Sequence, residues 1–423
     1  MAFGRSSKRF AVTCTVNIDR IAGGGDGVGH LEDGLVVFVP RSAPGDTLEI
    51  ELVRRKARYA RGRISTVVTP GPSRVEPECP HYQSDECGGC QLQHLSAESQ
   101  REIKGKIVGD ALRRIAKLSV EDPEVVASPQ QWRYRGKITL ASKDGQLGLR
   151  PYDRPDAAFD LGDCLLVQDR VMALWKLVSS NRALLPDTME SLVLRVDRLG
   201  GQHVLSVGGQ TCWDAEPLAE AMGGDETSFW WKPQKGAARV VAGPQTGYPA
   251  VAFEQMNTIM AEQIRSTAVD GFGKMDGKIA WDLYGGVGDT ADLLAARGAT
   301  AWSVDWDRTA VGWGLANSER TESPGTRVTR IADRVEEAVR RLPEPELVVV
   351  NPPRSGLGSR LADWLQRWGE RGKGASMAYI SCDPATLARD LARMPSFEIR
   401  KLVAYDLFPQ TGHVETLTML EAV

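Results

Sequence analysis

The stretch KIAWDLYGGVGDTADLLAARGATAWSVDWD, residues 278–307, constrains the fold more than any other part of the chain. Its pattern predicts a buried strand, a glycine turn, a helix, and a second strand that ends at Asp305. Two further apolar runs, 347–350 and 377–380, are also followed by polar residues. Strands that alternate with helices are typical of a doubly wound parallel sheet, so we predict an α/β domain over residues 266–423.

The glycine turn and the neighbouring strand ends form a candidate cofactor site. Open α/β sheets bind ligands at the carboxyl ends of their strands, where glycines let the backbone approach the ligand. Asp305 is placed to accept hydrogen bonds from ribose hydroxyls, and Asp333 is a candidate for the adenine edge. Both dinucleotides and S-adenosylmethionine use such loops, whereas the lack of G-x-x-x-x-G-K-[ST] argues against a nucleotide triphosphatase. The candidate turn residues are Tyr284, Gly285 and Gly286.

Cys382, in YISCDPATLARD, lies between the end of a predicted strand and the start of a predicted helix. A cysteine there can be a small buried hydrophobic residue. It can also be a nucleophile, because the dipole at a helix N-terminus lowers the pKa of a thiol. This stretch alone leaves both interpretations open.

Composition limits the remaining possibilities. A chain of 423 residues suggests about three domains, and 42% hydrophobic with 25% charged residues is typical of a globular protein with a large core. The net charge is only −3, so any contact with nucleic acid must come from local basic patches. There is no signal-peptide pattern and no apolar run of membrane-spanning length, so we expect a cytoplasmic monomer without membrane contact.

Residues 1–72 are predicted to form a small β-barrel. Short alternating apolar and polar segments are separated there by glycine-rich turns such as GGGDGVG. The run RRKARYARGR contains no acidic residue. It is either a solvated strand edge or a surface that binds an RNA backbone and stacks a base on its tyrosine. The candidate RNA-binding residues are Arg54, Arg55, Lys56, Arg58 and Tyr59.

Residues 73–265 are predicted to form a central, mainly antiparallel domain, because their segments are short, strand-like and broken by Gly, Pro and Asp. A helical pattern over about 95–122 precedes these strands, and this helix could pack on the catalytic domain. The first strand, WRYRGKITL, places Arg133 and Arg135 beside aromatic residues and is a second possible RNA surface.

Three cysteines, Cys79, Cys87 and Cys90, are crowded together as C-x7-C-x2-C. An odd total of seven cysteines argues for metal binding or catalysis rather than disulfides. A structural zinc site usually shows two short cysteine pairs, whereas a cubane iron–sulfur cluster needs four thiolates and suits a three-plus-one arrangement. Cys164 is the preferred fourth ligand, with Cys212 as the competitor. We therefore predict a closed [4Fe–4S] cluster with a structural or redox-sensing role.

Taken together, Cys382, DLFPQTGHVE, DLYGGVG and the cysteine cluster resemble the RNA uracil-C5 methyltransferases, which form 5-methyluridine. The resemblance covers nearly the whole chain. It implies an OB-like TRAM barrel, an iron–sulfur central domain, and a Rossmann-like class I domain that uses S-adenosyl-L-methionine. The family's SC[ND]PATLARD motif implies that Cys382 is the nucleophile, and FPxTxHVE implies that Glu415 is the base. Its FxQxN cofactor motif matches Phe253, Gln255 and Asn257.

The chemistry requires these groups. Uracil C5 is a poor nucleophile, so a thiolate adds to C6 to form an enolate whose C5 accepts the methyl group. A base then removes the C5 proton so that the thiol can leave. Two positions depart from the family pattern. Asn351 replaces a usual Asp in the pocket but can still hydrogen-bond a uracil edge, and Gly285 replaces the cysteine of DLYCG, for which we expect little consequence.

The barrel and cluster resemble the branch that acts on 23S ribosomal RNA, although some cluster-bearing relatives modify tRNA. A non-catalytic iron–sulfur protein that binds RNA is an alternative, which intact Cys382 and Glu415 argue against. Asn-Pro-Pro also resembles amino-methyltransferases, but Arg354 stands where they carry an aromatic residue. His413 is the first alternative base. We expect an RNA methyltransferase whose partner is rRNA, or else tRNA.

Overall fold

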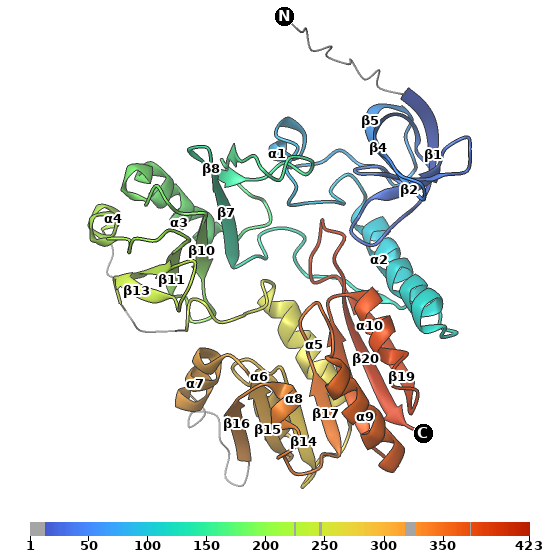
Figure 1. Ribbon diagram of the computed structural model, residues 1–423, viewed down its shortest axis with the longest axis vertical. Helices are drawn as coiled ribbons and strands as arrows, with labels where there is room; N and C mark the ends of the chain where they lie inside the picture. Colours follow the sequence, from blue (N-terminus) through green and yellow to red (C-terminus); the bar gives the residue numbers. More distant parts are fainter. Residues whose placement is uncertain (1–12, 224–225, 245–247, 318–326, 373) are drawn as a thin grey trace, which may run out of the picture.

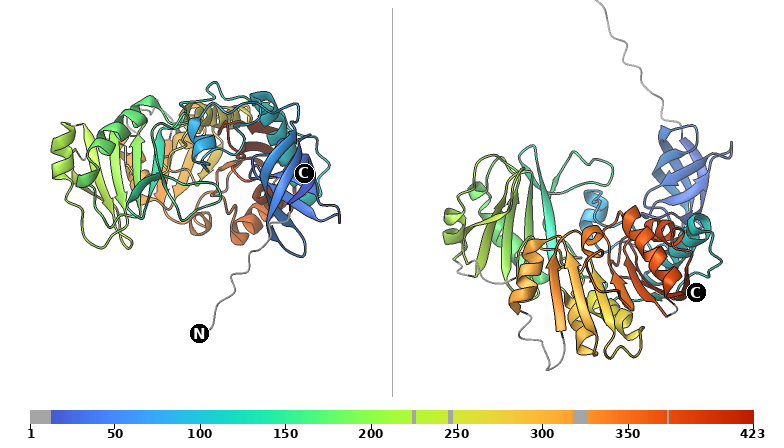
Figure 2. Two further views of the ribbon diagram at one scale, coloured as in Figure 1. Left: turned by 90° about the horizontal axis from the view of Figure 1, so that it is seen from above. Right: turned by 60° about the horizontal axis from the view of Figure 1, so that its bottom comes forward.

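The computed structural model describes residues 13–223, 226–244, 248–317, 327–372 and 374–423, and its named strands form three sheets. The first twelve residues of the predicted barrel domain therefore lie outside the described residues. The central sheet and the barrel lie on opposite sides of the molecule, with the α/β sheet between and below them (Figures 1 and 2). Within the described parts, no helix is both long and apolar enough to cross a membrane.

The N-terminal sheet is a closed five-stranded barrel with the order β1-β2-β3-β5-β4. Alternate residues such as Val16, Ile18, Leu48 and Ile50 point inward and form its core, which confirms the predicted barrel. The basic run spans the tip of the β4–β5 hairpin, where residues 54–58 are exposed. The strands are β1 Thr13–Ile21, β2 Gly27–His30, β3 Val36–Val39, β4 Thr47–Arg55 and β5 Ala60–Thr69.

The central sheet has seven strands in the order β13-β12-β11-β10-β7-β8-β9. All its neighbours are antiparallel except β11 and β12, as expected for a mainly antiparallel domain. The strands are β7 Lys137–Lys143, β8 Gln146–Leu149, β9 Phe159–Asp160, β10 Ser191–Val196, β11 Gln202–Val207, β12 Thr227–Lys232 and β13 Arg239–Ala242. Helices α3 Asp169–Ser180 and α4 Glu216–Met222 pack on it, and a 3-10 turn spans Arg182–Leu184.

The C-terminal sheet has the order β16-β15-β14-β17-β18-β20-β19-β6. Its first five strands are parallel, as predicted, and β20 inserts antiparallel between β18 and β19. The strands are β14 Ile279–Leu283, β15 Thr300–Asp305, β16 Arg327–Ala332, β17 Leu347–Val350, β18 Ser376–Ser381, β19 Phe397–Tyr405 and β20 Glu415–Ala422. Its helices are α5 Thr258–Asp270, α6 Asp289–Ala296, α7 Arg308–Asn317, α8 Val335–Ala338, α9 Ser359–Arg371 and α10 Pro384–Leu391.

Two segments that we assigned to the central domain lie in the C-terminal layer. Helix α5 packs on α6 and β20, so the boundary predicted at residue 265 falls inside a helix. Strand β6, Val125–Val126, extends the C-terminal sheet beside β19. Helix α5 belongs to the C-terminal domain because its buried apolar residues pack in the same core as the parallel strands.

Helix α2, Ala97–Ala111, continues into a π-helical turn, η1 Leu112–Ala116, and both pack on α10. Val108 and Leu112 are fully buried in the same core as Leu387 of α10. This helix therefore packs on the catalytic domain, although it precedes the central sheet in the chain. A short helix, α1 Pro80–Ser84, begins directly after Cys79.

Candidate active site

The carboxyl ends of the five parallel strands bring most of the predicted site residues to one edge of the sheet. Backbone hydrogen bonds join neighbouring ends, from Tyr284 N–H to Val304 O at 2.9 Å and from Asp333 N–H to Asp305 O at 3.0 Å. The residues at this edge are Tyr284, Gly285 and Gly286 after β14, Asp305 on β15, Asp333 after β16, Asn351 after β17 and Cys382 after β18.

Cys382 and Glu415 face each other across two neighbouring strands. In the antiparallel pair β18–β20, Ser381 is opposite Thr416, so the next facing positions are Cys382 and Glu415. The hydroxyl of Thr416 donates to the carbonyl of Ser381 at 3.1 Å and closes this end of the ladder. The inserted strand β20 therefore brings residues 33 positions apart in the chain to one point.

The Glu415 carboxyl is 1% exposed, and its Oε2 has no hydrogen-bond partner among the described residues. Burial raises the pKa of Glu415 to about 8, whereas the Arg354 guanidinium acts in the opposite direction. Burial also raises the pKa of the Cys382 thiol, and Glu415 raises it further. The expected lowering by the helix dipole is therefore not the net result at Cys382, since desolvation outweighs it.

Arg354 is a residue whose position at this site the sequence interpretation missed. It follows the Asn-Pro-Pro segment after β17 and is exposed. Its positive charge lowers the pKa of both Cys382 and Glu415, so it favours the reactive ionised form of each. The signal was present as a charged residue at a strand end, but we used it only to argue against amino-methyltransferases.

His413 lies in the loop before β20. Burial is the main cause that lowers the pKa of His413 to about 4, and the positive charge of Arg354 adds to it. The ring is therefore neutral near pH 7. The ring makes an edge contact with Phe408, with centroids 6.1 Å apart.

The glycine turn is fastened to Asp305. The Oδ2 atom of Asp305 accepts a hydrogen bond from Gly286 N–H at 2.9 Å, and its Oδ1 atom accepts one from Asp307 N–H at 2.8 Å. Tyr284 has a positive φ of 63°, which a sharp turn at the strand end requires. The carboxylate of Asp333 does not contact the glycine turn as that of Asp305 does, and instead forms an ion pair with Arg341.

Gly285 is closely packed against two polar side chains. Beneath it, the Ser303 hydroxyl donates to buried Asp282 at 3.1 Å, and burial raises the pKa of Asp282 to about 7. A Cβ at Gly285 would lie 2.3 Å from Asp282 and 2.3 Å from Ser303. The cysteine of DLYCG would therefore require this pair to move, and the expectation that glycine here has little consequence stays a prediction.

The FEQMN segment lies between the central domain and the α/β sheet. Phe253 is 72% exposed, whereas Asn257 is buried and caps α5 by accepting from Met260 N–H at 3.3 Å. Asn257 also donates to Leu407 O at 3.2 Å, which ties this segment to the loop before β20. Asn257 thus has a structural position, and Phe253 and Gln255 remain candidates for ligand contact.

A second link joins this segment to the glycine turn. Arg198 donates to Glu254 at 2.7 Å and to both carboxylate oxygens of Asp289 at 2.8 Å each. Asp289 is the first residue of α6, directly after the glycine turn. Arg195 pairs with the same Glu254 at 2.5 Å, and both guanidinium groups lie over the ring of Tyr248.

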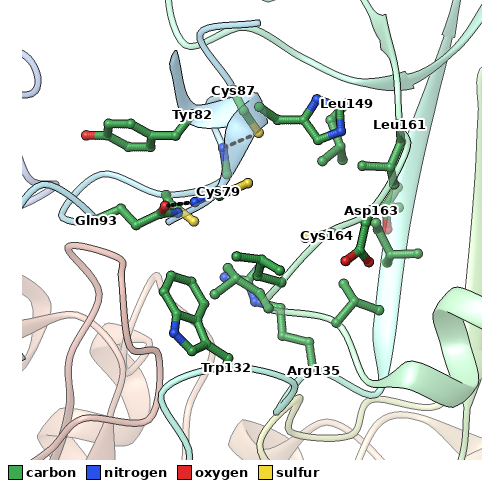
Figure 3. A pocket seen from close by; sticks show the side chains of 18 of the residues that line it. Cys79, Tyr82, Cys87, Gln93, Trp132, Arg135, Leu149, Leu161, Asp163 and Cys164 are labelled. Atoms are coloured by element: carbon green, nitrogen blue, oxygen red, sulfur yellow. Dashed lines mark hydrogen bonds between the residues drawn. The ribbon is translucent and has the colours of Figure 1, made fainter. Parts of the chain in front are cut away.

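Four cysteines line one cavity of about 260 Å³ between α1 and the central sheet (Figure 3). They are Cys79, Cys87, Cys90 and Cys164. Cys212 is exposed and is not in the cavity lining, so it does not compete for this site. Burial raises the pKa of Cys87 to about 11 and that of Cys90 to about 12, while Arg135 lowers the pKa of Cys90 and Cys164.

Across the described ranges, no three His, Cys, Asp or Glu side chains are grouped closely enough to hold one metal ion. A single zinc ion would need sulfurs about 3.8 Å apart, because Zn–S bonds are about 2.3 Å long. In a cubane cluster each thiolate binds a different iron, so the sulfurs lie further apart. Among the described residues, the four cysteines therefore do not form a preformed site for a single metal ion.

Arg133 and Arg135 are partly exposed and also have contacts within the protein, so their RNA-binding role stays a prediction. Arg133 donates to both oxygens of Asp163, at 2.9 and 2.6 Å, and to Cys164 O at 3.0 Å. Arg135 lines the cysteine cavity. The sequence pattern did not reveal the ion pair of Arg133 with Asp163.

The basic hairpin of the barrel remains exposed at Arg54, Arg55, Lys56 and Arg58. Arg55 forms an ion pair with Asp33. Tyr59 is half-buried, with its ring against Phe38 at a centroid distance of 5.9 Å and the Lys56 ammonium 5.4 Å from its centroid.

Two family models match the chain. Residues 245–423 match the family described as tRNA (Uracil-5-)-methyltransferase, and residues 12–65 match the TRAM domain. The predicted barrel and the α/β domain are thereby assigned to known families. The fold and its site define an RNA methyltransferase.

Relatives give the particular family. The chain is 31% identical over 446 residues to the 23S rRNA (uracil(1939)-C(5))-methyltransferase of Halomonas elongata, covering 96% of this chain and 88% of that protein. It is 30% identical to an uncharacterized RNA methyltransferase of Corynebacterium efficiens, covering 96% and 94%. The crystal structure of Pyrococcus abyssi tRNA (uracil-54, C5)-methyltransferase with S-adenosyl-L-homocysteine shares the fold, with a TM-score of 0.70, 24% identity and coverage of 96% and 99%. The chain belongs to the RNA uracil-C5 methyltransferase family.

Proposed function

We propose that this chain methylates C5 of a uridine in RNA, with Cys382 as the nucleophile and Glu415 as the base. The observation that carries this proposal is the β18–β20 register, which sets a thiol opposite a buried carboxylate at the ligand-binding edge of the sheet. The free Oε2 of Glu415 supports the base role, because a base needs an acceptor that the protein does not already use.

Each of these residues has a defined task. The Cys382 thiolate forms a bond to C6 of uracil, and the electron pair of the C5–C6 double bond passes into an enolate. S-adenosylmethionine, when bound, supplies the electrophilic methyl group to C5. Glu415 then accepts the C5 proton, the C5–C6 double bond re-forms, and the bond from C6 to Cys382 breaks. A base whose pKa is near 8 has enough proton affinity for this step and is still partly ionised near neutral pH.

Arg354 assists both ionised groups without taking a proton. Its charge lowers the pKa of Cys382 and Glu415 against the effect of burial. Asn351 follows β17 at the same edge, where its amide can hydrogen-bond a uracil edge without exchanging a proton.

S-adenosylmethionine, the methyl donor, would bind at the part of the sheet edge that carries the glycine turn. Asp305 is oriented by two backbone N–H groups, and its carboxylate keeps further acceptor capacity for ribose hydroxyls. Asp333 would contact the adenine edge, and Phe253 and Gln255 would contribute from the central side. The turn itself would be lined by Tyr284, Gly285 and Gly286.

The four-cysteine cavity would hold a [4Fe–4S] cluster. Its support is the chemistry of the donor set, since four thiols and the Arg135 cation line one apolar-walled space. When bound, the cluster would cross-link the segment of Cys79–Cys90 to Cys164. It takes no part in the methyl-transfer steps proposed above.

We propose 23S rRNA as the substrate, because the relative with 31% identity acts on that RNA. The structural neighbour, which acts on tRNA, makes tRNA the second candidate. Tritium release from RNA labelled at uridine C5 tests the reaction, and rRNA fragments compared with tRNA transcripts test the substrate. We expect release from rRNA that depends on S-adenosylmethionine. Methylation without tritium release would indicate an amino-methyltransferase, and binding without either would indicate a non-catalytic protein.

A further inference from the structure

The loop between β19 and β20 leads directly into Glu415, and its centre is held by residues outside the α/β domain. Gln410 is 5% exposed and has a φ of 69°, a conformation that residues with a Cβ rarely adopt. Its carbonyl accepts from Gln91 N–H at 3.1 Å and Leu92 N–H at 3.0 Å, the two residues after Cys90.

The side chain of Gln100, on α2, completes this arrangement. Its Oε1 accepts from Gln410 N–H at 2.9 Å, and its Nε2 donates to the Gln410 side chain at 2.9 Å. Gln100 is 1% exposed and also donates to Leu95 O at 2.9 Å. The amide of Gln100 is thus also held by the segment that precedes α2.

The residues on the amino side of Gln410 are held in the same way. Lys104 of α2 is fully buried, and it pairs with Asp406 at 2.5 Å and donates to Phe408 O at 2.9 Å. The hydroxyl of Tyr134 donates to Pro409 O at 2.9 Å. On the other side, a Cβ at Gly412 would lie within 3.0 Å of barrel backbone atoms, so the loop has no room to shift there.

We infer that Gln410, clamped by Gln100, is a positioning residue that sets the place of Glu415 for removal of the C5 proton. This inference rests on the proposed role of Glu415. Only four residues separate Gln410 from Glu415, so a change in the backbone at Gln410 is passed on to the base. Cys382 follows β18 and is not part of this loop.

The inference predicts a selective defect. In Gln100→Ala the buried N–H of Gln410 loses its acceptor, whereas in Gln410→Gly the backbone conformation is easier and only the side-chain pair is lost. Both variants should still add Cys382 to C6 and transfer the methyl group. Removal of the C5 proton should slow by about 10- to 100-fold, more in Gln100→Ala, because displacement of a reacting group by about 1 Å has effects of this size.

The experiment follows the covalent species in full-length, cluster-loaded protein. RNA and methyl-labelled S-adenosylmethionine are mixed with each variant, samples are quenched over time, and labelled protein–RNA adduct is measured on denaturing gels. The inference predicts rapid formation and slow decay of the adduct in both variants. Gln366→Ala is the matched control, because Gln366 is also a helix glutamine that accepts from a loop N–H, that of Ser396 at 3.1 Å. Its adduct should decay as in the wild type.

The outcomes separate this inference from the proposed function. If Glu415→Gln accumulates adduct but Gln100→Ala and Gln410→Gly decay at the wild-type rate, the positioning role is wrong. Equal slowing of adduct formation and decay, together with a lowered Tm, would indicate a merely structural role and would also overturn it. If Glu415→Gln itself accumulates no adduct, the assignment of the base fails instead.

Discussion

Arg198 of the central domain and Asp289 of helix α6 are joined by two hydrogen bonds of 2.8 Å each. The same guanidinium donates to Glu254 at 2.7 Å. Glu254 stands between Phe253 and Gln255 in the sequence. Arg198 therefore fixes the FEQMN segment relative to the helix that follows the glycine turn. These are the two segments proposed to contact S-adenosylmethionine.

The first prediction concerns this link. Arg198→Ala should raise the Kd for S-adenosylhomocysteine by about 10-fold, since hydrogen bonds between charged groups contribute on the order of 1.5–3 kcal/mol. Arg198→Lys should restore little, because one lysine ammonium cannot replace the two guanidinium nitrogens that separately contact Glu254 and Asp289. Titration calorimetry measures this, with Arg182→Ala, another ion-paired arginine of the central domain, as the control. An unchanged Kd in Arg198→Ala would contradict the link.

The second prediction concerns pH and the buried carboxyl. Burial raises the pKa of Glu415 from 4.5 to about 8 in the folded protein, so its protonated form is favoured by folding. That contribution is complete below pH 4.5 and is lost as the pH rises to about 8, with a slope of at most about 1.4 kcal/mol per pH unit. Glu415→Gln should therefore be more stable than the wild type near pH 7.5, and the difference should shrink toward pH 5. In the wild type, kcat/KM should rise through about pH 8 as the carboxylate forms.

Melting temperatures at several pH values test the stability effect. Glu421→Gln is the control, because Glu421 lies on the same strand but is partly exposed and paired with Arg400. A pH-independent difference between Glu415→Gln and the wild type would mean that Glu415 is not a buried titrating group.

The sequence was sufficient for the parts of the site that are local in the chain. The glycine turn, Asp305 and the crowded cysteines each carry their signal within a few residues. The contact between Cys382 and Glu415 could not be derived from periodicity, because it depends on β20 inserting between β18 and β19. Family resemblance supplied the pair, and the strand register supplies the physical reason.

Charged residues were the least predictable. Arg133 was assigned to RNA from its sequence neighbours, and the sequence did not reveal its ion pair with Asp163, which lies 30 positions away. The role of Arg354 was also missed, because its effect on Glu415 arises only when the end of β17 and the start of β20 lie at the same edge. The predicted domain boundary at residue 265 falls inside α5 for a similar reason. The sequence of a helix reveals which face is apolar, but it does not reveal which sheet that face covers.

The third prediction concerns the cysteine cavity. Anaerobically purified protein should contain about four iron atoms per chain and show a broad visible absorption band. Cys164→Ala should lose most of both, because it removes one of the four thiolates that line the cavity. Cys212→Ala is the matched control and should keep a full cluster, since Cys212 is exposed elsewhere. Zinc in place of iron, or a full cluster in Cys164→Ala, would contradict the assignment.

The fourth prediction concerns the exposed hairpin. Neutralising Arg54, Lys56 and Arg58 should weaken RNA binding and flatten the slope of log affinity against log salt by roughly 0.7 to 0.9 for each lost phosphate contact. Arg55→Gln should have a smaller effect, because Arg55 is already paired with Asp33. Neutralising Arg360 and Arg367 on α9, which lies away from the barrel (Figure 1), is the control. An unchanged slope would leave the hairpin as a solvated surface.

The central claim is the division of the reaction between Cys382 and Glu415. Cys382→Ala should give neither methylated RNA nor a covalent species, because no bond to C6 can form. Glu415→Gln keeps the shape but cannot accept the C5 proton, so methylated RNA should stay bound through Cys382. RNA that contains 5-fluorouridine should trap the wild type in the same way, because fluorine at C5 cannot leave as a proton.

The most direct test is denaturing electrophoresis of Glu415→Gln, Cys382→Ala and their double variant after incubation with RNA and methyl-labelled S-adenosylmethionine. We expect a labelled protein–RNA band in Glu415→Gln that disappears in Cys382→Ala and in the double variant. Methylation of C5 by Cys382→Ala would contradict the nucleophile. Rapid turnover without a band in Glu415→Gln would contradict the base.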